Sequence, residues 1–251
     1  MIKFFRKIRQ KLVSENKFSK YLIYAIGEIV LVVIGILIAL SINNWNESLK
    51  LEQREIDIAK ELYFELNENL SYTKTQKENW KKRANTAQFL SNIIVSAKET
   101  LTQKQFDSTM LYILGYYKFN LIKNKFDNIV SSETFEFKRS PKLKREMLTL
   151  KGLYGTLEGY YESNVEVNKN LLRPYLNENY SFRNFNNVIL KETDGFKVNH
   201  ETLLNDIKFD NVIQNIIGSS MPFVNYFEIT INKIEGLKKQ LEDNYPSIIN
   251  D

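Results

Sequence analysis

The chain has 251 residues, and its 35 Lys and Arg against 30 Asp and Glu give a formal net charge of +5. This length is enough for one good-sized domain, or two small ones, with a substantial core. With no cysteine and a single histidine, the composition excludes disulfides, thiolate zinc sites, iron–sulfur clusters, cysteine nucleophiles and multi-histidine metal sites, and no cofactor is expected.

The positive charge is concentrated in the first 20 residues. Seven of the 35 basic residues lie there against one acid, Glu15, so residues 1–20 carry +6 and the rest of the chain carries −1. The basic residues are Lys3, Arg6, Lys7, Arg9, Lys11, Lys17 and Lys20. Because the charge is confined to a tail, it predicts no nucleic-acid partner. It predicts contact with an anionic membrane leaflet, or a role in topology alone.

Residues 21–42 are predicted to form a transmembrane helix. This run of 22 residues contains one charge, Glu28, and would extend about 33 Å as a helix, enough for a hydrocarbon layer of about 30 Å. Tyr21, Tyr24 and Trp45 flank the run and match the aromatic anchors found at membrane interfaces.

The basic residues also predict the orientation of this helix. Seven precede the run, whereas residues 43–62 hold three, so the positive-inside rule places the tail in the cytoplasm and residues 43–251 in the periplasm of a bacterial inner membrane. A cleaved signal peptide is the alternative, because Ala39-Leu40-Ser41 has a small-x-small pattern. The run is longer than a signal h-region, which favours an uncleaved signal anchor.

One side of the predicted span carries an acid and two small residues. Gly35 and Ala39 follow Glu28 by seven and eleven positions, which places all three within about 20° of one another around a helix. An acid at this depth is a functional-site hypothesis, and small-xxx-small spacing lets a second helix approach. We therefore predict a contact face for a homo-oligomer or a membrane partner. The alternative is that Glu28 is protonated or reaches the headgroups.

After the span the sequence predicts an all-α fold. Apolar residues continue at 3–4 spacing to about Ala97, with no Gly or Pro between Ile36 and Tyr112, so the transmembrane helix should continue into a long helix of an antiparallel helical bundle. Lapses in the apolar stripe at Lys77 and Ser91 favour a bundle over a two-stranded coiled coil.

Local signals predict the next helices. Thr102 and Gln105 have the spacing of a capping box, Gly115 closes that helix, and a short helix surrounds Ile129.

Ser140 and Pro141 predict the start of a longer helix, as N-cap and first residue, which Pro174 stops or kinks. Its mid-helix glycines are expected to pack closely against a neighbouring helix, because each would otherwise cost about 1 kcal/mol. They are Gly152, Gly155 and Gly159.

The C-terminal part is predicted to contain one small β-hairpin and two helices. Residues 188–190 and 196–198 flank Thr193-Asp194-Gly195, a turn signal between apolar runs. Helices are expected over 203–217 and 223–244, separated by residues 218–222, which include Gly218 and Pro222.

The sequence contains no catalytic motif that a purely structural role would not explain better. His200-Glu201 begins like a zinc-protease motif, but Leu204 occupies the second histidine position. His200 is expected to open a helix capped by Asn199. We therefore expect no enzymatic activity.

Residues 1–47 contain strings, among them 24–28, 33–40 and 43–47, that are recognisable, and later segments match more loosely. In these strings the chain resembles a Bacteroidota family of single-pass membrane proteins that is known only as a domain of unknown function. The match over residues 1–47 is specific, and Glu133 departs from the family's pattern of a Gly after two serines. The resemblance implies a membrane anchor and a helical exported domain, and it implies no activity. The matching segments are residues 2–9, 14–22, 24–28, 33–40, 43–47, 118–120, 126–132 and 171–176.

The sequence therefore predicts a membrane-anchored, non-enzymatic envelope protein divided into a cytoplasmic tail (1–20), a transmembrane helix (21–42) and a helical periplasmic domain (43–251) for protein–protein interaction. The alternative is a periplasmic module that binds a small molecule or peptide and acts through a membrane partner. A 20-residue tail is too short to hold an output domain, so signalling would require a partner.

Overall fold

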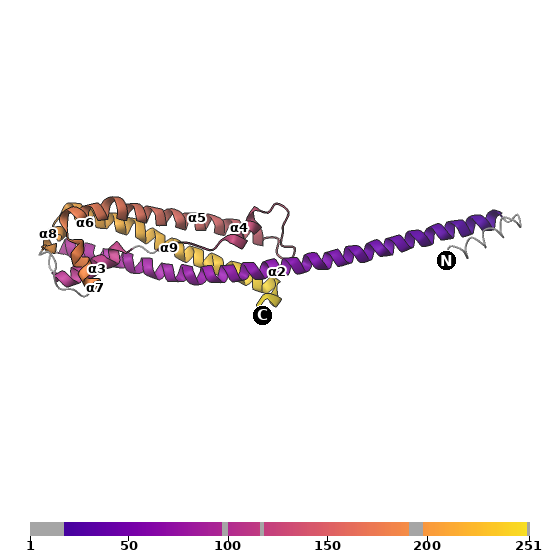
Figure 1. Cartoon of the computed structure of the whole chain (residues 1–251), viewed down its shortest axis with the longest axis horizontal. Helices are drawn as coiled ribbons and strands as arrows, with labels where there is room; N and C mark the ends of the chain where they lie inside the picture. The colour runs from indigo at the N-terminus through magenta and orange to yellow at the C-terminus, as the bar shows by residue number, and fades with distance from the viewer. Residues whose placement is uncertain (1–17, 97–99, 116–117, 191–197, 250–251) are drawn as a thin grey trace. The chain divides into compact units, whose positions relative to one another are not determined.

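The computed structural model describes residues 18–96, 100–115, 118–190 and 198–249. Within these ranges the chain is helical and has no strand, which confirms the all-α class (Figure 1). The basic residues from Lys3 to Lys17 lie outside the described ranges. The α-helices are α2 (Phe18–Ser96), α3 (Gln103–Leu114), α4 (Asn124–Ser131), α5 (Leu143–Val167), α6 (Arg173–Asn179), α7 (Phe182–Leu190), α8 (His200–Leu204) and α9 (Ile207–Asn244). A π-helical segment (Asn168–Leu172) joins α5 to α6, and a 3₁₀ turn (Pro246–Ile249) follows α9.

Contacts divide the chain into two compact units, residues 1–57 and 58–251. The first half of α2 forms the described part of unit 1, and every residue from 29 to 54 in it is exposed. One helix is thus long and apolar enough to cross a membrane. Helix α2 ends at Ser96, which confirms the predicted end near Ala97.

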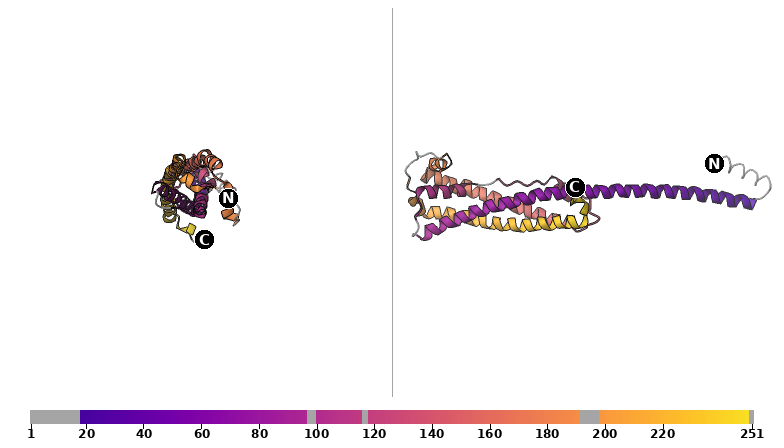
Figure 2. Two further views of the ribbon diagram at one scale, coloured as in Figure 1. Left: turned by 90° about the vertical axis from the view of Figure 1, so that its left-hand side faces the viewer. Right: turned by 90° about the horizontal axis from the view of Figure 1, so that it is seen from below.

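In unit 2, α9 runs antiparallel to α2 and α5, and the three helices lie side by side (Figure 2). Along α2, Tyr63 donates a hydrogen bond of 2.8 Å to Glu242, and Gln214 donates one of 2.8 Å to Ser91. Low residue numbers of α2 therefore pair with high numbers of α9. Ion pairs between Lys74 and Glu235 (2.7 Å) and between Lys77 and Glu228 lie between these two ends.

The core face of α2 in unit 2 follows a regular spacing of three and four residues. Ten buried positions fit this spacing, and they are Ala59, Leu62, Leu66, Asn69, Thr73, Gln76, Trp80, Arg83, Ala87 and Leu90. Such spacing keeps one side of a helix against its neighbours. The middle of the stripe is polar, which is unusual for a core and needs specific partners.

Aromatic side chains fill the centre of unit 2 around Phe223. Its ring centroid lies 4.9 Å from that of Trp80, 4.5 Å from that of Phe227 and 6.1 Å from that of Phe119. A second core cluster packs around Phe106 where α3, α6, α7, α8 and the start of α9 meet. Eleven Phe and Tyr side chains of the described residues are buried, and these serve packing.

Helix α5 does not stop at Pro174. Residues 168–172 form a π-helical segment and α6 continues through Pro174 to Asn179. Proline cannot donate to the carbonyl four residues earlier and its ring crowds that carbonyl. A π-helical turn before Pro174 widens the backbone there, so the helix continues.

The predicted break at residues 218–222 is wrong, because α9 runs unbroken from Ile207 to Asn244 with Pro222 inside it. The carbonyl that loses its hydrogen bond to Pro222 belongs to Gly218, which is exposed and can bind water. Phe223 and Phe227 are fully buried just after the proline. Their burial offsets the cost of about 3 kcal/mol for proline inside a helix.

The predicted hairpin is also wrong. Residues 188–190, expected as its first strand, form the last turn of α7, and residues 191–197, which include the predicted turn, lie outside the described ranges. Phe182 and Phe185 lie on one side of α7, with ring centroids 5.5 Å apart, so helical spacing of aromatic residues prevailed over β-propensity.

The start of α5 differs from the prediction by two residues. Ser140 and Pro141 lie in a turn closed by a hydrogen bond of 2.9 Å from Leu143 N–H to Ser140 C=O, and Lys142 is the N-cap. By contrast, the capping box of Thr102 and Gln105, the closure of α3 at Gly115, the helix around Ile129 and the Asn199 cap are all confirmed.

The prediction that Gly152, Gly155 and Gly159 allow a neighbouring helix of this chain to pack closely is wrong. All three are exposed, and a Cβ added at any of them would meet no atom within 4 Å. They form a bare strip on the outer side of α5, because the core side of that helix carries Leu150, Tyr154 and Leu157 instead.

Candidate functional site

The predicted contact face of the span lies on the first half of α2. Gly35 and Ala39 are exposed and Glu28 is half-buried, and a Cβ at Gly35 would meet no atom within 4 Å. Of the aromatic residues predicted to lie at the membrane interfaces, Tyr24 and Trp45 are exposed. The side chain of the third, Tyr21, and that of the basic residue Lys20 are not among those the structure describes. A helix from another chain therefore has room to approach this face.

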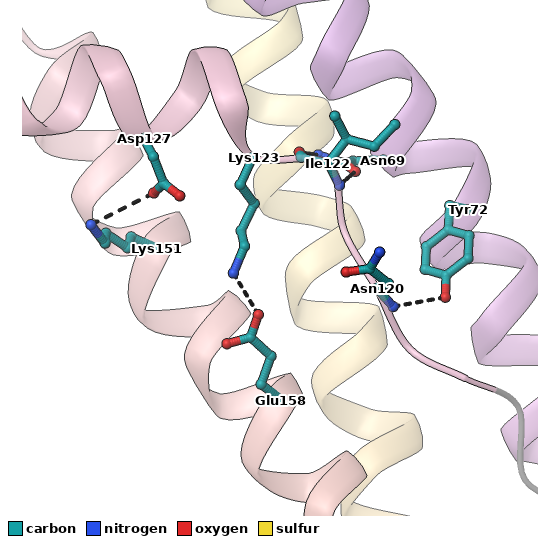
Figure 3. Close-up of polar contacts among 8 residues, drawn as sticks. All are labelled: Asn69, Tyr72, Asn120, Ile122, Lys123, Asp127, Lys151 and Glu158. Carbon is teal, nitrogen blue, oxygen red and sulfur yellow. Dashed lines mark hydrogen bonds and ion pairs between the residues drawn. The ribbon is translucent and has the colours of Figure 1, made fainter.

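In unit 2, polar side chains of α2 hold an extended strap, residues 118–123, against the helix (Figure 3). Asn69 donates to the Ile122 carbonyl at 2.6 Å and accepts from the Ile122 N–H at 3.0 Å. Tyr72 Oη donates to the Lys118 carbonyl at 2.7 Å and accepts from the Asn120 N–H at 3.0 Å. These side chains replace the ladder bonds that a neighbouring strand would provide.

The strap alternates between the core and the surface. Phe119 and Leu121 are buried, whereas Lys118, Asn120 and Ile122 are exposed. This period of two matches an extended chain with one face on a core. The buried side of the strap packs on three helices, because the Phe119 ring contacts Tyr72 of α2, Tyr161 of α5 and Phe223 of α9.

Glu65 fixes the end of the strap by capping α4. Its two carboxylate oxygens accept hydrogen bonds from the N–H groups of Lys125 (2.8 Å) and Phe126 (2.9 Å). The N-cap residue of α4, Lys123, makes no side-chain cap bond. A carboxylate at a helix N-terminus satisfies free N–H groups and is favoured by the helix dipole, so Glu65 supplies from α2 the cap that α4 lacks.

Two ion pairs connect this region to α5. Lys123 Nζ lies 2.5 Å from Glu158, and Lys151 Nζ lies 3.6 Å from Asp127 (Figure 3). All four side chains are at least partly exposed, so each pair contributes no more than about 1 kcal/mol. The pairs orient the strap, while Asn69, Tyr72 and Glu65 bind it.

Arg83 is the most unusual residue of the core. It is 1% exposed, and its guanidinium donates to the Ile113 carbonyl (3.0 Å), to Asn164 Oδ1 (2.9 Å) and to Ser220 Oγ (2.6 Å). These partners lie on α3, α5 and α9. One side chain of α2 therefore joins all three neighbouring helices.

The charge of Arg83 faces a helix terminus. No carboxylate among the described residues pairs with it, and burial lowers its pKa to about 10, so the side chain is charged at neutral pH. Ile113 and Leu114 are the last residues of α3, and their carbonyls accept from Arg83 and from Asn168 Nδ2 (3.0 Å). The negative end of a helix dipole partly compensates a buried cation.

An open groove of about 660 Å³ lies between α2 and α3. Lys81, Asn85 and Phe89 line it from α2, and Tyr112 from α3. The Lys82 ammonium lies 4.0 Å from the centroid of the Tyr112 ring, as in a cation–π contact. This groove has hydrogen-bonding groups and two exposed aromatic rings.

The polar core residues were not predicted from the sequence, although a signal for them existed. Asn69, Gln76 and Arg83 occupy the same spacing as the apolar residues around them, and a polar residue at such a position indicates a specific buried partner. Within the described residues no group of three His, Asp or Glu residues is placed to hold a metal ion.

Residues 28–219 match a family described as "Family of unknown function (DUF6090)". The chain belongs to this family. The region shared with the DUF6090 family begins at Glu28 within the span and extends through the strap, Arg83 and Asn164 to Ser219. Searches of curated proteins and of solved structures gave no significant match.

Proposed function

We propose that this DUF6090 member is a single-pass protein of a bacterial inner membrane, with a cytoplasmic tail and a periplasmic helical unit that binds a protein partner. The apolar stretch of α2 is the observation that supports a membrane anchor. In the most apolar 18-residue window of that helix, no residue is buried. Burying one Leu, Ile or Val side chain is worth about 1.5–3 kcal/mol, so a helix apolar on all sides favours a lipid environment.

The polar groups in unit 2 support a binding role in place of catalysis. Arg83, Glu65 and Asn69 are buried, and each bonds to backbone groups of another element. Their chemistry is thus used to hold helices and the strap in place. The exposed glycine strip of α5 leaves a helix surface with no side chains, which suits close approach by a partner helix.

Membrane anchoring and orientation are tested with single cysteines, since the chain has none of its own. In intact spheroplasts, an impermeant maleimide should label Ser163→Cys on the exposed side of α5 and spare Ser14→Cys in the tail. The protein should also resist carbonate extraction. Labelling of Ser14→Cys alone would contradict the orientation.

The matched control introduces two charges into the span. Leu31→Arg combined with Ile34→Arg should release the protein from the membrane, because each Arg at a helix centre costs about 2.5–3.5 kcal/mol. If the unmodified chain is extracted as readily as this variant, α2 is not an anchor.

Cysteine crosslinking tests whether a second copy is the partner in the membrane. Gly35→Cys and Ala39→Cys lie on the Glu28 side of α2, and Leu37→Cys lies on the opposite side. Oxidation in membranes should give a disulfide-linked dimer at Gly35→Cys or Ala39→Cys, with little at Leu37→Cys. Equal yields at all three positions would mean random collision, and no dimer at any would require a different partner.

The groove between α2 and α3 favours a second function, binding of a small molecule or peptide that a membrane partner then senses. Its exposed aromatic rings and its Lys, Asn and Thr side chains are the kinds of group that orient a polar ligand. Phe89→Ala would weaken such binding and leave membrane insertion unchanged, which separates this function from the first.

A further inference from the structure

Three hydrogen-bonding atoms on the core face of α2 have no partner in the described part of the chain. They are Thr73 Oγ1, Gln76 Oε1 and Trp80 Nε1. Thr73 and Trp80 are fully buried, and Gln76 is 8% exposed. A buried polar atom without a hydrogen bond destabilises a protein, and such atoms are rare. Three of them along one helix face therefore call for a partner that is not a side chain of α2.

The three residues are neighbours on the surface of α2. Gln76 follows Thr73 by three positions, and Trp80 follows Gln76 by four. This spacing places them within about 60° of one another around the helix and within about 10.5 Å along its axis. Side chains three and four positions apart lie next to each other on a helix, so the three atoms border the same part of the core.

The groups around Trp80 do not provide the missing bonds. The ring centroid of Phe223 lies 4.9 Å from that of Trp80, and a phenyl ring has no oxygen or nitrogen. The Arg83 guanidinium lies 5.2 Å from the centroid of the Trp80 ring, but Arg83 only donates hydrogen bonds, as the indole N–H does. The ammonium group of Lys77 forms an ion pair with Glu228.

The chemistry of the three atoms identifies the kind of ligand. The indole N–H of Trp80 only donates, the amide oxygen of Gln76 only accepts, and the Thr73 hydroxyl does both. An anion would be repelled by the Gln76 oxygen, and a cation by the indole N–H. A water molecule can accept from Trp80 and donate to Gln76 and Thr73, and three hydrogen bonds are typical of a buried water.

Reversing the Gln76 amide does not remove the need for a ligand. The reversed amide would place an NH₂ group where the oxygen lies, and two donors, this group and the indole N–H of Trp80, cannot bond to each other. A water molecule accepts from both and donates to the Thr73 hydroxyl. Only the reversed amide would admit an anion, and a halide has no proton to give a signal with the indole, so the experiment below separates the two.

We infer that unit 2 binds a water molecule in its core, held by Trp80 Nε1, Gln76 Oε1 and Thr73 Oγ1. This water site lies on α2 between Asn69, which holds the strap, and Arg83, which joins α3, α5 and α9. The bound water satisfies the polar positions of the α2 stripe for which the described chain offers no group. It thereby makes a polar segment of α2 compatible with a packed aromatic core. The inference is independent of both proposed functions.

NMR spectroscopy of the full chain in lipid nanodiscs tests for the water directly. The chain has two tryptophans, so Trp45→Phe, at an exposed position of α2, leaves Trp80 with the only indole N–H. The protein is otherwise deuterated and carries ¹⁵N-tryptophan. The Trp80 Hε1 proton should then show a cross-relaxation peak with water, with the sign expected of a bound molecule. Absence of this peak would overturn the inference, whether the indole bonds directly to Gln76, binds an anion or has no partner.

Two variants in the same background exclude another source of the peak. Thr73→Val removes a hydroxyl whose proton exchanges with solvent and could relay the signal, and the peak should persist because Gln76 still binds the water. Thr73→Val combined with Gln76→Leu removes both other partners. In this double variant the peak should be lost and the fluorescence of Trp80 should shift to shorter wavelength, as for an indole that loses a polar partner.

The matched control is Thr75→Val, at an exposed position of α2, which should change neither the peak nor the fluorescence. Circular dichroism checks that the double variant is folded, and the peak in the Trp45→Phe protein tests the site even if it is not. Loss of the peak in Thr73→Val alone would mean that the hydroxyl relayed it. That result, or a peak that persists in the folded double variant, would contradict the water site.

Discussion

Replacing Arg83 by Ala is expected to lower the free energy of unfolding of the protein by about 3–5 kcal/mol. The substitution removes three hydrogen bonds, leaves the Ile113 carbonyl at the end of α3 without a donor, and opens a cavity where a fully buried side chain stood. Asn164 keeps the hydroxyls of Ser219 and Ser220 as donors, so the loss should concentrate on α3. Chemical denaturation in detergent, followed by circular dichroism, measures it.

The control is Arg145→Ala, at an exposed position of α5, which should change stability by less than about 0.5 kcal/mol. Arg83→Met restores most of the volume without the donors and should fall between the two. If Arg83→Ala costs no more than Arg145→Ala, then Arg83 does not join the helices as the contacts indicate.

Phe223→Ala is expected to cost about 3–5 kcal/mol as well, through a cavity at the centre of unit 2. Phe223 is fully buried and packs against aromatic rings from α2, the strap and α9. Because its burial also keeps α9 continuous across Pro222, the variant should show faster amide exchange around residues 218–222 than at either end of the helix.

Ile229→Ala, at an exposed position of the same helix, is the matched control and should cost less than about 1 kcal/mol with no local change near Pro222. Uniform acceleration along α9 in Phe223→Ala would mean that the helix unfolds as one unit and that the proline is not its weak point.

Features with a purely local cause were predictable from the sequence. The length of the apolar run, the capping box at Thr102, the closing Gly115 and the Asn199 cap depend on residues within a few positions of one another. The uninterrupted helical spacing of α2 likewise predicted an end near Ala97, and the helix ends at Ser96. In each case the hydrogen bonds involved connect neighbours in the chain.

Predictions failed where distant residues changed the local balance. Pro222 and Gly218 signal a break, but burial of Phe223 and Phe227 against α2 and the strap stabilises a continuous α9. Residues 188–190 favour a strand by composition, but their helix packs Phe182 and Phe185 on the second core cluster, around Phe106. Tertiary burial outweighed a local preference each time.

The buried polar residues belong to the same class. Glu65 bonds to a group 61 positions away in the chain, Asn69 to one 53 positions away and Arg83 to one 137 positions away. A local sequence pattern therefore cannot predict their partners. The spacing of α2 shows only that these residues face inward. What each one binds follows from the docking of the strap, α3, α5 and α9.

By itself, the sequence determined the helical class of this protein and located its apolar span and its basic tail. The spacing of apolar residues and the positions of charged residues are properties of the sequence and do not depend on tertiary contacts. The tertiary structure alone decided that α9 is continuous, that the glycines of α5 face outward and that Glu65, Asn69 and Arg83 hold the core. The reason is physical: each of these depends on the free energy of contacts between segments that fold together from distant parts of the chain.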